Sequence, residues 1–528
     1  MDYKKLAAAG MSAALLLSIG GSALAKAPGS ASPAREDTTV TASSESGAPR
    51  KGKPSPRSDA ERVSKSGRGD GATDAAEKQK REKPSRKPER KPDKQTDGTR
   101  TAEKPKKGSE AAESGTNSRP TRKTKTTESG GAATAEQRGK TQKQSSAAPT
   151  DYAAANTLTQ SATDAVYRST NDSENAVLVS GDKVTLTNAT VDKTGDASGD
   201  NADFYGVNAT VLAKDGAELT IEGAKITSNG AHANGVSSYG EGTTVEISDS
   251  TITTTGSTSG GLMTTGGGTM IANNLTVKTS GNSSAAIRSD RGGGTVIVNG
   301  GSYESGGVGS PAIYSTADIT VNEATLTSTA SEGVIVEGKN SVTLNGVTLT
   351  DTNTKHAGKS STDKNIFLYQ SMSGDASVGT ALFAANDSTI VTNRGDTIYV
   401  TNTTAEIELK NNRLVNNANG ALLRVEAAKW GTAGKNGGDV TLELENQKAS
   451  GDIVIDALST LAMKLEDGSA YTGAINGANT AKSVALTLEA GTKWVLTGDS
   501  YMSSLSGDTS GIDLNGHTLY VGGSVWAK

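Results

Sequence analysis

The sequence contains no cysteine, and aromatic residues make up only 3% of its 528 residues. Without cysteine the chain can form neither a disulfide nor a thiolate metal site. Its three histidines, His232, His356 and His517, lie far apart in the sequence, so a histidine-based metal centre is not expected. A glycine-rich phosphate loop followed by a helix is also missing. We therefore expect neither a metal nor a cofactor.

A long apolar segment that could anchor the chain in a membrane is missing as well. Residues 1–25 instead have the features of a secretory signal: Lys4 and Lys5, then an apolar stretch at 6–19, then a small-residue cleavage site at 23–25. The apolar stretch is too short and too rich in Ala and Gly for a membrane span. No cysteine follows the cleavage site, which excludes a lipoprotein anchor. We expect a secreted protein whose mature form begins at Lys26.

The formal net charge of −4 hides a division of the chain into a basic part and an acidic part. Residues 26–150 contain 29 Lys and Arg against 17 Asp and Glu, whereas residues 151–528 contain 23 against 40. Large apolar residues are almost missing from 26–150, and such a segment cannot bury enough surface to offset the entropy lost on ordering. We expect a disordered basic arm that either binds anionic wall polymers or membrane headgroups or serves as a solvated spacer. The arm has no aromatic residues to stack on bases, so we expect no nucleic-acid partner.

A short pattern of apolar and turn residues recurs between residues 219 and 350. Its first copy is Leu219-Thr220-Ile221-Glu222-Gly223-Ala224-Lys225-Ile226, and the leading apolar positions of the copies are 219, 245, 270, 296, 319 and 342. A second apolar series precedes each copy at similar spacing, and its members are Val207, Val236, Leu262, Ile287, Ile313 and Val334. A period near 25 residues, built from strands and turns, is typical of a solenoid.

These repeats predict an all-β fold, a right-handed parallel β-helix over residues 176–528, with 151–175 as a possible N-terminal cap. The regular pattern lapses between 351 and 377, where residues 355–364 are predicted to leave the coil as a surface excursion. One turn position holds Asn in four consecutive copies: Asn273, Asn299, Asn322 and Asn345. Asn tolerates left-handed backbone angles, and stacked Asn side chains can form a hydrogen-bonded ladder. The alternative is that these four are ordinary turn residues.

Near its end the chain contains the runs Gly491-Thr492-Lys493-Trp494-Val495-Leu496-Thr497-Gly498-Asp499-Ser500 and Ile512-Asp513-Leu514-Asn515-Gly516-His517-Thr518-Leu519-Tyr520-Val521, with Leu505 between them. This part resembles the closing coils of pertactin-like autotransporter passenger domains, which are right-handed β-helix adhesins of bacterial surfaces. The resemblance covers roughly residues 484–523 in motif and 176–523 in architecture. Such passengers are followed by a membrane β-barrel, which the sequence to Lys528 does not contain. The resemblance therefore implies a bacterial surface adhesin without self-transport.

Other extracellular β-helices resemble polysaccharide lyases and glycoside hydrolases, whose sites need clustered carboxylates beside an Arg or Lys. The nearest such cluster here is Arg288, Asp290 and Arg291, with Asp200 and Asp203 on an earlier turn. The spacing gives no reason for these carboxylates to share a face. We therefore predict a binding protein rather than an enzyme, with a polysaccharide-degrading activity as the alternative.

The tripeptide Arg-Gly-Asp occurs twice, as Arg68, Gly69 and Asp70 in the arm and as Arg394, Gly395 and Asp396 between two predicted strands. One hypothesis is integrin binding, and the other is ordinary turn chemistry in a chain rich in Gly. The sequence as a whole predicts a secreted protein retained at the bacterial cell surface. Its solenoid is expected to bind an extracellular carbohydrate or a host or bacterial surface protein.

Overall fold

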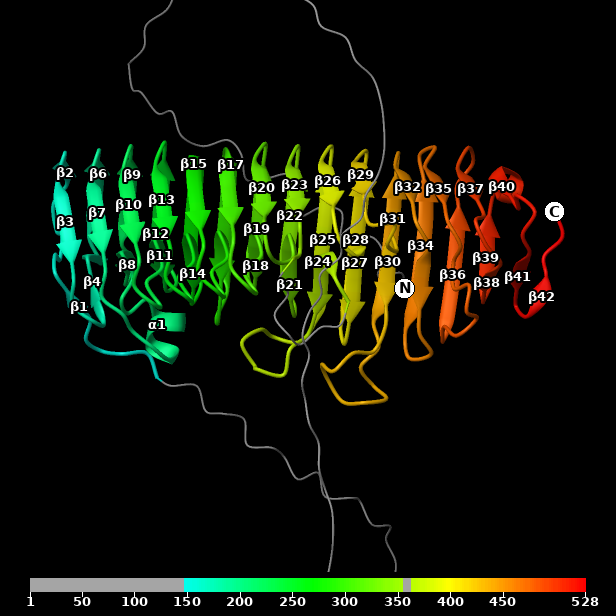
Figure 1. Ribbon diagram of the computed structural model, residues 1–528, viewed down its shortest axis with the longest axis horizontal. Coiled ribbons are helices and arrows are strands. Elements are labelled where there is room, and N and C mark those ends of the chain that lie inside the picture. Colours follow the sequence, from blue (N-terminus) through cyan, green and yellow to red (C-terminus); the bar gives the residue numbers. More distant parts are fainter. Residues whose placement is uncertain (1–146, 355–361) are drawn as a thin grey trace, which may run out of the picture. The chain divides into compact units, whose positions relative to one another are not determined.

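The structure is a computed structural model that describes residues 147–354 and 362–528. The expected signal segment, residues 26–146 of the expected arm with Arg68, Gly69 and Asp70, and residues 355–361 of the expected excursion lie outside the described residues. Nearly all regular structure in the described ranges is β-strand (Figure 1). No helix in these ranges is both long and apolar enough to cross a membrane.

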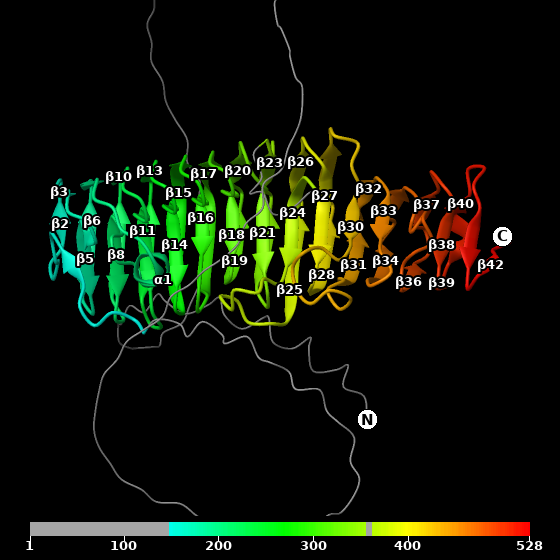
Figure 2. The ribbon, with the colours of Figure 1, turned by 60° about the horizontal axis from the view of Figure 1, so that its bottom comes forward.

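The described chain winds into coils, and equivalent strands of successive coils lie side by side (Figures 1 and 2). One side of the stack is an eleven-stranded parallel sheet, seen from the front in Figure 2. Its strands, in spatial order, are β5 (Val177–Ser180), β8 (Val211–Lys214), β11 (Val236–Tyr239), β14 (Leu262–Thr265), β16 (Ile287–Ser289), β18 (Ile313–Ser315), β21 (Val334–Glu337), β24 (Lys364–Tyr369), β27 (Asp396–Thr401), β30 (Leu423–Val425) and β33 (Ile453–Ile455).

The other two strands of each coil belong mostly to a twenty-two-stranded sheet, because the long strands β15 (Gly268–Thr279) and β17 (Gly294–Ser305) run through both positions. The strands at the earlier position are β2 (Ala162–Thr163), β6 (Lys183–Thr187), β9 (Glu218–Glu222), β12 (Thr244–Ser248), β19 (Asp318–Asn322), β22 (Ser341–Asn345), β25 (Thr380–Asn386), β28 (Thr404–Lys410), β31 (Asp439–Glu445), β34 (Thr460–Glu466), β36 (Ser483–Leu488) and β39 (Ser504–Gly507). Those at the later position are β3 (Val166–Ser169), β7 (Thr190–Lys193), β10 (Lys225–Ser228), β13 (Thr251–Thr254), β20 (Thr325–Ser328), β23 (Thr348–Asp351), β26 (Thr389–Thr392) and β29 (Arg413–Asn416).

The ends of the stack are built from shorter elements. A four-stranded sheet contains β32 (Lys448–Ser450), β35 (Ala470–Thr472), β37 (Lys493–Val495) and β40 (Ile512–Asp513). The remaining elements are β1 (Ala153–Ala154), β4 (Glu174–Asn175), β38 (Ser500–Met502), β41 (Leu519–Val521), β42 (Ser524–Val525), the helix α1 (Asp200–Tyr205) and a 3-10 turn, Thr509–Gly511. β41 and β42 pair antiparallel, so the last coil ends in a hairpin instead of a further parallel strand.

The expected fold class, an all-β parallel β-helix, is confirmed. All six leading apolar residues of the repeat stack in register, as Leu219, Val245 and Met270 do at the start of the series. They are at most 1% exposed, so each column of like residues buries its apolar surface inside the coil. In the second series the stacked residue is Val211, not Val207, because α1 lengthens the coil before β8.

The segment 151–175, expected as a possible cap, has the strand pattern of a coil. β1 pairs in parallel with β4, β2 with β6, and β3 with β7. The coiled structure therefore begins near residue 153, and the segment covers the end of the stack as its first coil. The expected excursion is also shorter than predicted, since Lys364 is the first residue of β24 and is fully buried.

The four Asn side chains form a ladder along the outside of the stack. The Nδ2 of Asn299 donates to the Oδ1 of Asn273 at 2.9 Å, and the same bond at the same distance joins the next two rungs. The ladder continues one rung further, to Asn386. The left-handed residue of this turn is the one that follows, such as Asn274 with φ 53° or Gly300 with φ 69°. The ladder thus depends on side-chain hydrogen bonding and not on the backbone tolerance of Asn.

Replacing an inner rung of this ladder should cost more stability than replacing its last rung. Asn322→Ala removes two side-chain hydrogen bonds, whereas Asn386→Ala removes one. At about 1 kcal/mol for each bond, we expect losses of about 2 and about 1 kcal/mol in the free energy of unfolding. Chemical denaturation of both variants measures this difference, and equal losses would show that the rungs act only as separate turn residues.

Candidate functional site

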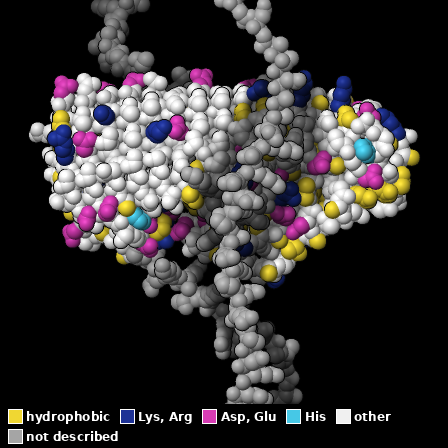
Figure 3. All heavy atoms as spheres, in the orientation of Figure 1, with side chains coloured by type: hydrophobic (Ala, Val, Ile, Leu, Met, Phe, Trp, Pro, Cys, Tyr) yellow, Lys and Arg dark blue, Asp and Glu magenta, His cyan; other side chains and the backbone are white. Residues whose placement is uncertain are grey.

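The outward faces of the two large sheets differ in chemistry. Outward positions of the later strands of the twenty-two-stranded sheet are mostly small and polar, as in the stacked pairs Thr227 with Thr253 and Thr327 with Thr350. Figure 3 shows a broad surface of side chains that are neither hydrophobic nor charged, with acidic and hydrophobic side chains gathered below it near α1. The outer face of the eleven-stranded sheet instead carries aromatic and charged residues. We call this the eleven-strand face.

One outward column of the eleven-strand face passes through the middle of every strand. In β16 and β18 the flanking residues point inward and are buried, so that Arg288 and Tyr314 point outward and are direct neighbours. From β14 to β30 the column reads Met263, Arg288, Tyr314, Ile335, Phe367, Tyr399 and Arg424. Such a series of large side chains at strand spacing offers a continuous contact surface along the stack.

Longer connections between strands place further residues beside this face. The chain takes 34 residues from Val177 to Val211 but only 25 from Val211 to Val236, and the extra residues include α1. α1 ends at Gly206, whose left-handed backbone (φ 77°) a residue with a side chain rarely adopts. Figure 2 shows α1 in front of this part of the stack. Two other connections, residues 370–379 and 426–438, follow β24 and β30.

A network of ion pairs joins α1 to the eleven-strand face. Arg288 donates to Asp290 at 2.8 Å, and both side chains are at most 10% exposed. Arg291 lies 2.7 Å from Asp375 and 3.5 Å from Asp200, and its guanidinium covers an aromatic ring of α1. The expectation from spacing that these carboxylates do not share a face is therefore wrong. The helical excursion of α1, which the repeat period does not contain, carries them across several coils.

A second member of α1 belongs to the same neighbourhood. The Nδ1 of His232 lies 2.5 Å from the Oδ1 of Asp203, and Asp203 lines a cavity of about 310 Å³ together with residues of β16 and β18. The other lining residues are Phe204, Ser283, Ala285, Arg288, Asp290, Gly309, Pro311, Tyr314 and Asp375. The unusual length of the coil before Val211 was the one available sequence signal for this arrangement.

Two features of the cavity wall are chemically notable. Burial raises the pKa of Asp290 to about 6, against the opposing effect of the Arg288 guanidinium beside it. The Nη1 of Arg288 is buried and has no hydrogen-bond partner. The cavity thus contains a fixed donor without an acceptor, a situation that costs free energy until a ligand or water supplies one. Among the described residues, no group of three His, Asp or Glu is placed to hold a metal ion.

Beyond the cavity the eleven-strand face becomes aromatic. Phe367 stacks on Tyr369 with ring centroids 4.5 Å apart, and Trp430 from the connection 426–438 lies 5.0 Å from Tyr369. Glu337 accepts hydrogen bonds from the hydroxyls of both Tyr314 and Tyr369. Burial, with Glu337 nearby, raises the pKa of Tyr369, so its hydroxyl stays a donor.

The buried charge of Lys364 also supports this aromatic group. Its Nζ lies 4.5 Å from the ring centre of Phe367 and 5.3 Å from that of Tyr399, and 3.5 Å from Glu332. Burial lowers the pKa of Lys364, and Glu332 opposes that shift. An ammonium over two ring faces fixes those rings in place.

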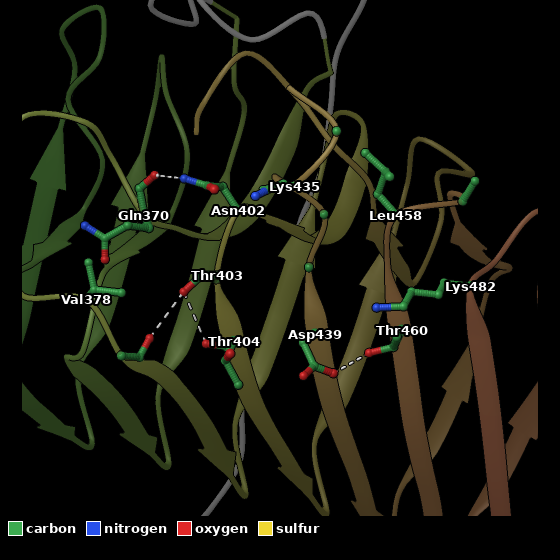
Figure 4. Close-up of a pocket in the computed structure, with 15 residues that line it drawn as sticks. Gln370, Val378, Asn402, Thr403, Thr404, Lys435, Asp439, Leu458, Thr460 and Lys482 are labelled. Carbon is green, nitrogen blue, oxygen red and sulfur yellow. Dashed lines mark hydrogen bonds between the residues drawn. The ribbon is translucent and has the colours of Figure 1, made fainter. Parts of the chain in front are cut away.

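A larger hollow of about 670 Å³ lies where the eleven-stranded sheet turns into the next sheet (Figure 4). Gln370 and Asn402, which follow β24 and β27, form one wall, and Figure 4 shows the Nδ2 of Asn402 donating to the Gln370 carbonyl at 2.8 Å. Its rim exposes apolar side chains: Val378 is 82% exposed and Leu458 38%. The remaining lining residues are Gly379, Thr403, Thr404, Gly434, Lys435, Gly437, Gly438, Asp439, Ala457, Thr460 and Lys482.

The second Arg-Gly-Asp tripeptide lies at the start of β27, beside the same face. Asp396 is 3% exposed, receives Arg424 at 2.5 Å and accepts the Ala421 amide at 2.8 Å. Arg394 is held by Asp363 at 2.5 Å. The integrin hypothesis therefore has no exposed aspartate at this position, and the local contacts are those of a structural turn.

Comparisons of the chain with family models, with curated proteins and with solved structures gave no match.

Proposed function

We propose that this protein is a cell-surface β-helix of adhesin type that binds an extended glycan along its eleven-strand face without cleaving it. The observation that carries the proposal is the contrast between faces: aromatic rings, paired charges and two hollows gather along one face. Sugar rings combine apolar faces with a rim of hydroxyl groups, and sites of this composition suit them.

The distance between the two hollows favours a polymer over a single small molecule. The smaller cavity is at β16 and β18, and the larger hollow begins beside β24 and β27. At about 4.8 Å for each strand, three or four steps along the sheet correspond to roughly 15–20 Å. The outward residues Tyr314 and Ile335 lie between the two hollows, on β18 and β21, so a linear chain of several sugar units would contact the sheet over its whole length.

The ion pairs at the smaller cavity support binding over catalysis. Asp290 is held by Arg288, Asp375 by Arg291, and Asp203 faces His232. A general base needs a free oxygen within reach of the proton that it removes. Charged groups that already hold one another are more suited to fixing a rigid binding surface.

Affinity that grows with glycan length is the expected result of this proposal. In calorimetry with neutral oligosaccharides of one to eight units, we expect affinity to rise up to about four to six units. Trp430→Ala should weaken binding by about 5-fold to 30-fold, as loss of an aromatic contact worth about 1–2 kcal/mol. Tyr501→Ala, which removes a ring stacked on Tyr520 away from this face, is the matched control and should leave binding unchanged. Equal effects of the two variants would contradict the assignment of the binding face.

Glycan cleavage is the second candidate, and one observation favours it. Three carboxylates and an arginine surround one cavity, and Asp290 has a pKa of about 6, as a group that exchanges protons near neutral pH would. Incubation with neutral and acidic polysaccharides, followed by assays for new reducing ends and for unsaturated products, tests it. Turnover that Asp290→Asn abolishes would move the protein to the enzyme class.

Retention at the cell belongs to the same proposal. The basic arm, residues 26–150, would hold the secreted protein against anionic wall polymers or headgroups, at about 1 kcal/mol for each well-placed Lys or Arg. Such contacts are screened by salt. Full-length protein that stays on cells through a wash with about 1 M salt would contradict this mode of retention.

A further inference from the structure

We propose that the cavity beside α1 is a subsite for one neutral sugar unit, held through two adjacent hydroxyl groups by Arg288 and the neighbouring carboxylates. This inference rests on the proposed glycan binding and names the chemistry of its best-defined position. The cavity of about 310 Å³ is at the small end of the range of roughly 300–1,000 Å³ for ligand sites, which suits a single ring.

The fixed donor of the site is Arg288. Its residue is only 9% exposed, and Asp290 holds one of its two terminal nitrogens at 2.8 Å, so the guanidinium is not free to turn away. The other terminal nitrogen, Nη1, has no hydrogen-bond partner. A buried, oriented donor in a cavity wall requires an acceptor from whatever occupies the cavity.

Acceptors face the same space. Asp203 and Asp375 are each engaged through Oδ1, by His232 and Arg291 respectively, and both side chains remain about one-fifth exposed. In the described part of the chain their Oδ2 atoms make no hydrogen bond that would satisfy them. A ligand that both accepts from Arg288 and donates to a carboxylate fits this wall, and two adjacent hydroxyls of a sugar do both.

The charge of the wall argues against an acidic ligand. Three carboxylates, Asp203, Asp290 and Asp375, line the cavity, but Arg288 is its one lining cation. A uronate, sulfate or phosphate group would meet a surplus of negative charge, and a cation would meet the free Nη1 of Arg288. A neutral polyhydroxy ring avoids both penalties, while Phe204 and Tyr314 supply apolar surface for its carbon face.

Matched neutral and acidic sugars test the inference directly on the full chain. We expect calorimetry to show binding of D-glucose or D-galactose, and at least tenfold weaker binding of the corresponding uronates, D-glucuronate and D-galacturonate. Arg288→Lys keeps a positive charge for Asp290 but removes Nη1, and should weaken binding of the neutral sugar at least tenfold. Arg424→Lys, on the same outward column and paired with Asp396, is the matched control and should have no effect.

A second variant guards against misfolding of the first. Asp203→Asn changes a partly exposed carboxylate, so it should fold normally and still lose at least threefold in affinity for the neutral sugar. Stronger binding of the uronate, or equal binding by Arg288→Lys and wild type, would overturn the subsite. Binding of long oligosaccharides without any effect of these variants would overturn the subsite but leave the proposed function. Failure of every glycan to bind would contradict both.

Discussion

Leu344→Asp is expected to lower the free energy of unfolding by at least about 4 kcal/mol. Leu344 is fully buried and lies in register between Val321 and Ala385 in the interior column of the coil. A carboxylate there is surrounded by apolar neighbours, and burying an unpaired charge is among the most costly single substitutions. Chemical denaturation monitored by circular dichroism measures the loss.

The neighbouring residue provides the control for this prediction. Thr343 is on the same strand but points to the outside, between Thr320 and Ala384. Thr343→Asp introduces the same carboxylate one residue earlier, and we expect a cost of about 1 kcal/mol or less, mainly from the low strand propensity of Asp. Similar costs for the two variants would show that the inward and outward positions are wrongly assigned.

Asp351→Asn is expected to stabilise the protein at pH 8 relative to pH 4, by a difference on the order of 3 kcal/mol. Asp351 is fully buried, and its pKa is raised to about 7 by that burial, with Glu332 and Asp363 acting in the same direction. One oxygen accepts the Asn393 amide at 3.1 Å, and the other has no hydrogen-bond partner. The ionised form is therefore disfavoured in the folded state.

The sign of the pH dependence follows from the raised pKa. In the unfolded chain an Asp titrates near pH 3.9, so above about pH 7 the folded protein must hold a charge that burial penalises. As the pH falls from about 7 to about 4, the folded state takes up this proton first and gains stability. Asp351→Asn removes this gain, and so its advantage over wild type should shrink as the pH falls.

Denaturation midpoints of wild type and variant between pH 4 and pH 8 measure this effect. Asp467→Asn, at an exposed turn, is the matched control, and its curve should run parallel to that of wild type. A constant difference between Asp351→Asn and wild type over this range would show that Asp351 does not titrate there.

The register of the coils could be predicted from the sequence because burial imposes a period on it. Leu219, Val245 and Met270 must all be apolar since each is stacked on the next in the interior. The Asn ladder was predictable for the same reason, because rungs such as Asn299 and Asn322 bond to one another across a fixed number of residues. Val207 was assigned wrongly because its neighbour α1 interrupts that period.

The candidate site was predictable only in part. Arg288, Asp290 and Arg291 were recognised as the closest cluster of charges, but the contact with Asp203 and Asp200 depends on how one inserted helix folds back over the sheet. No period relates inserted residues to the strands that they cover. Likewise, the aromatic group around Tyr369 joins strand residues to Trp430 of a long connection, and only three-dimensional contact brings them together.

Side-chain footprinting of the protein with and without a saturating neutral oligosaccharide tests the central claim most directly. If the eleven-strand face is the binding face, bound glycan should protect Phe204, Tyr314 and Trp430 from hydroxyl radicals. The stacked pair Tyr501 and Tyr520, away from that face, should be modified equally with and without glycan. Protection of Tyr501 and Tyr520, with Phe204, Tyr314 and Trp430 unchanged, would contradict the account.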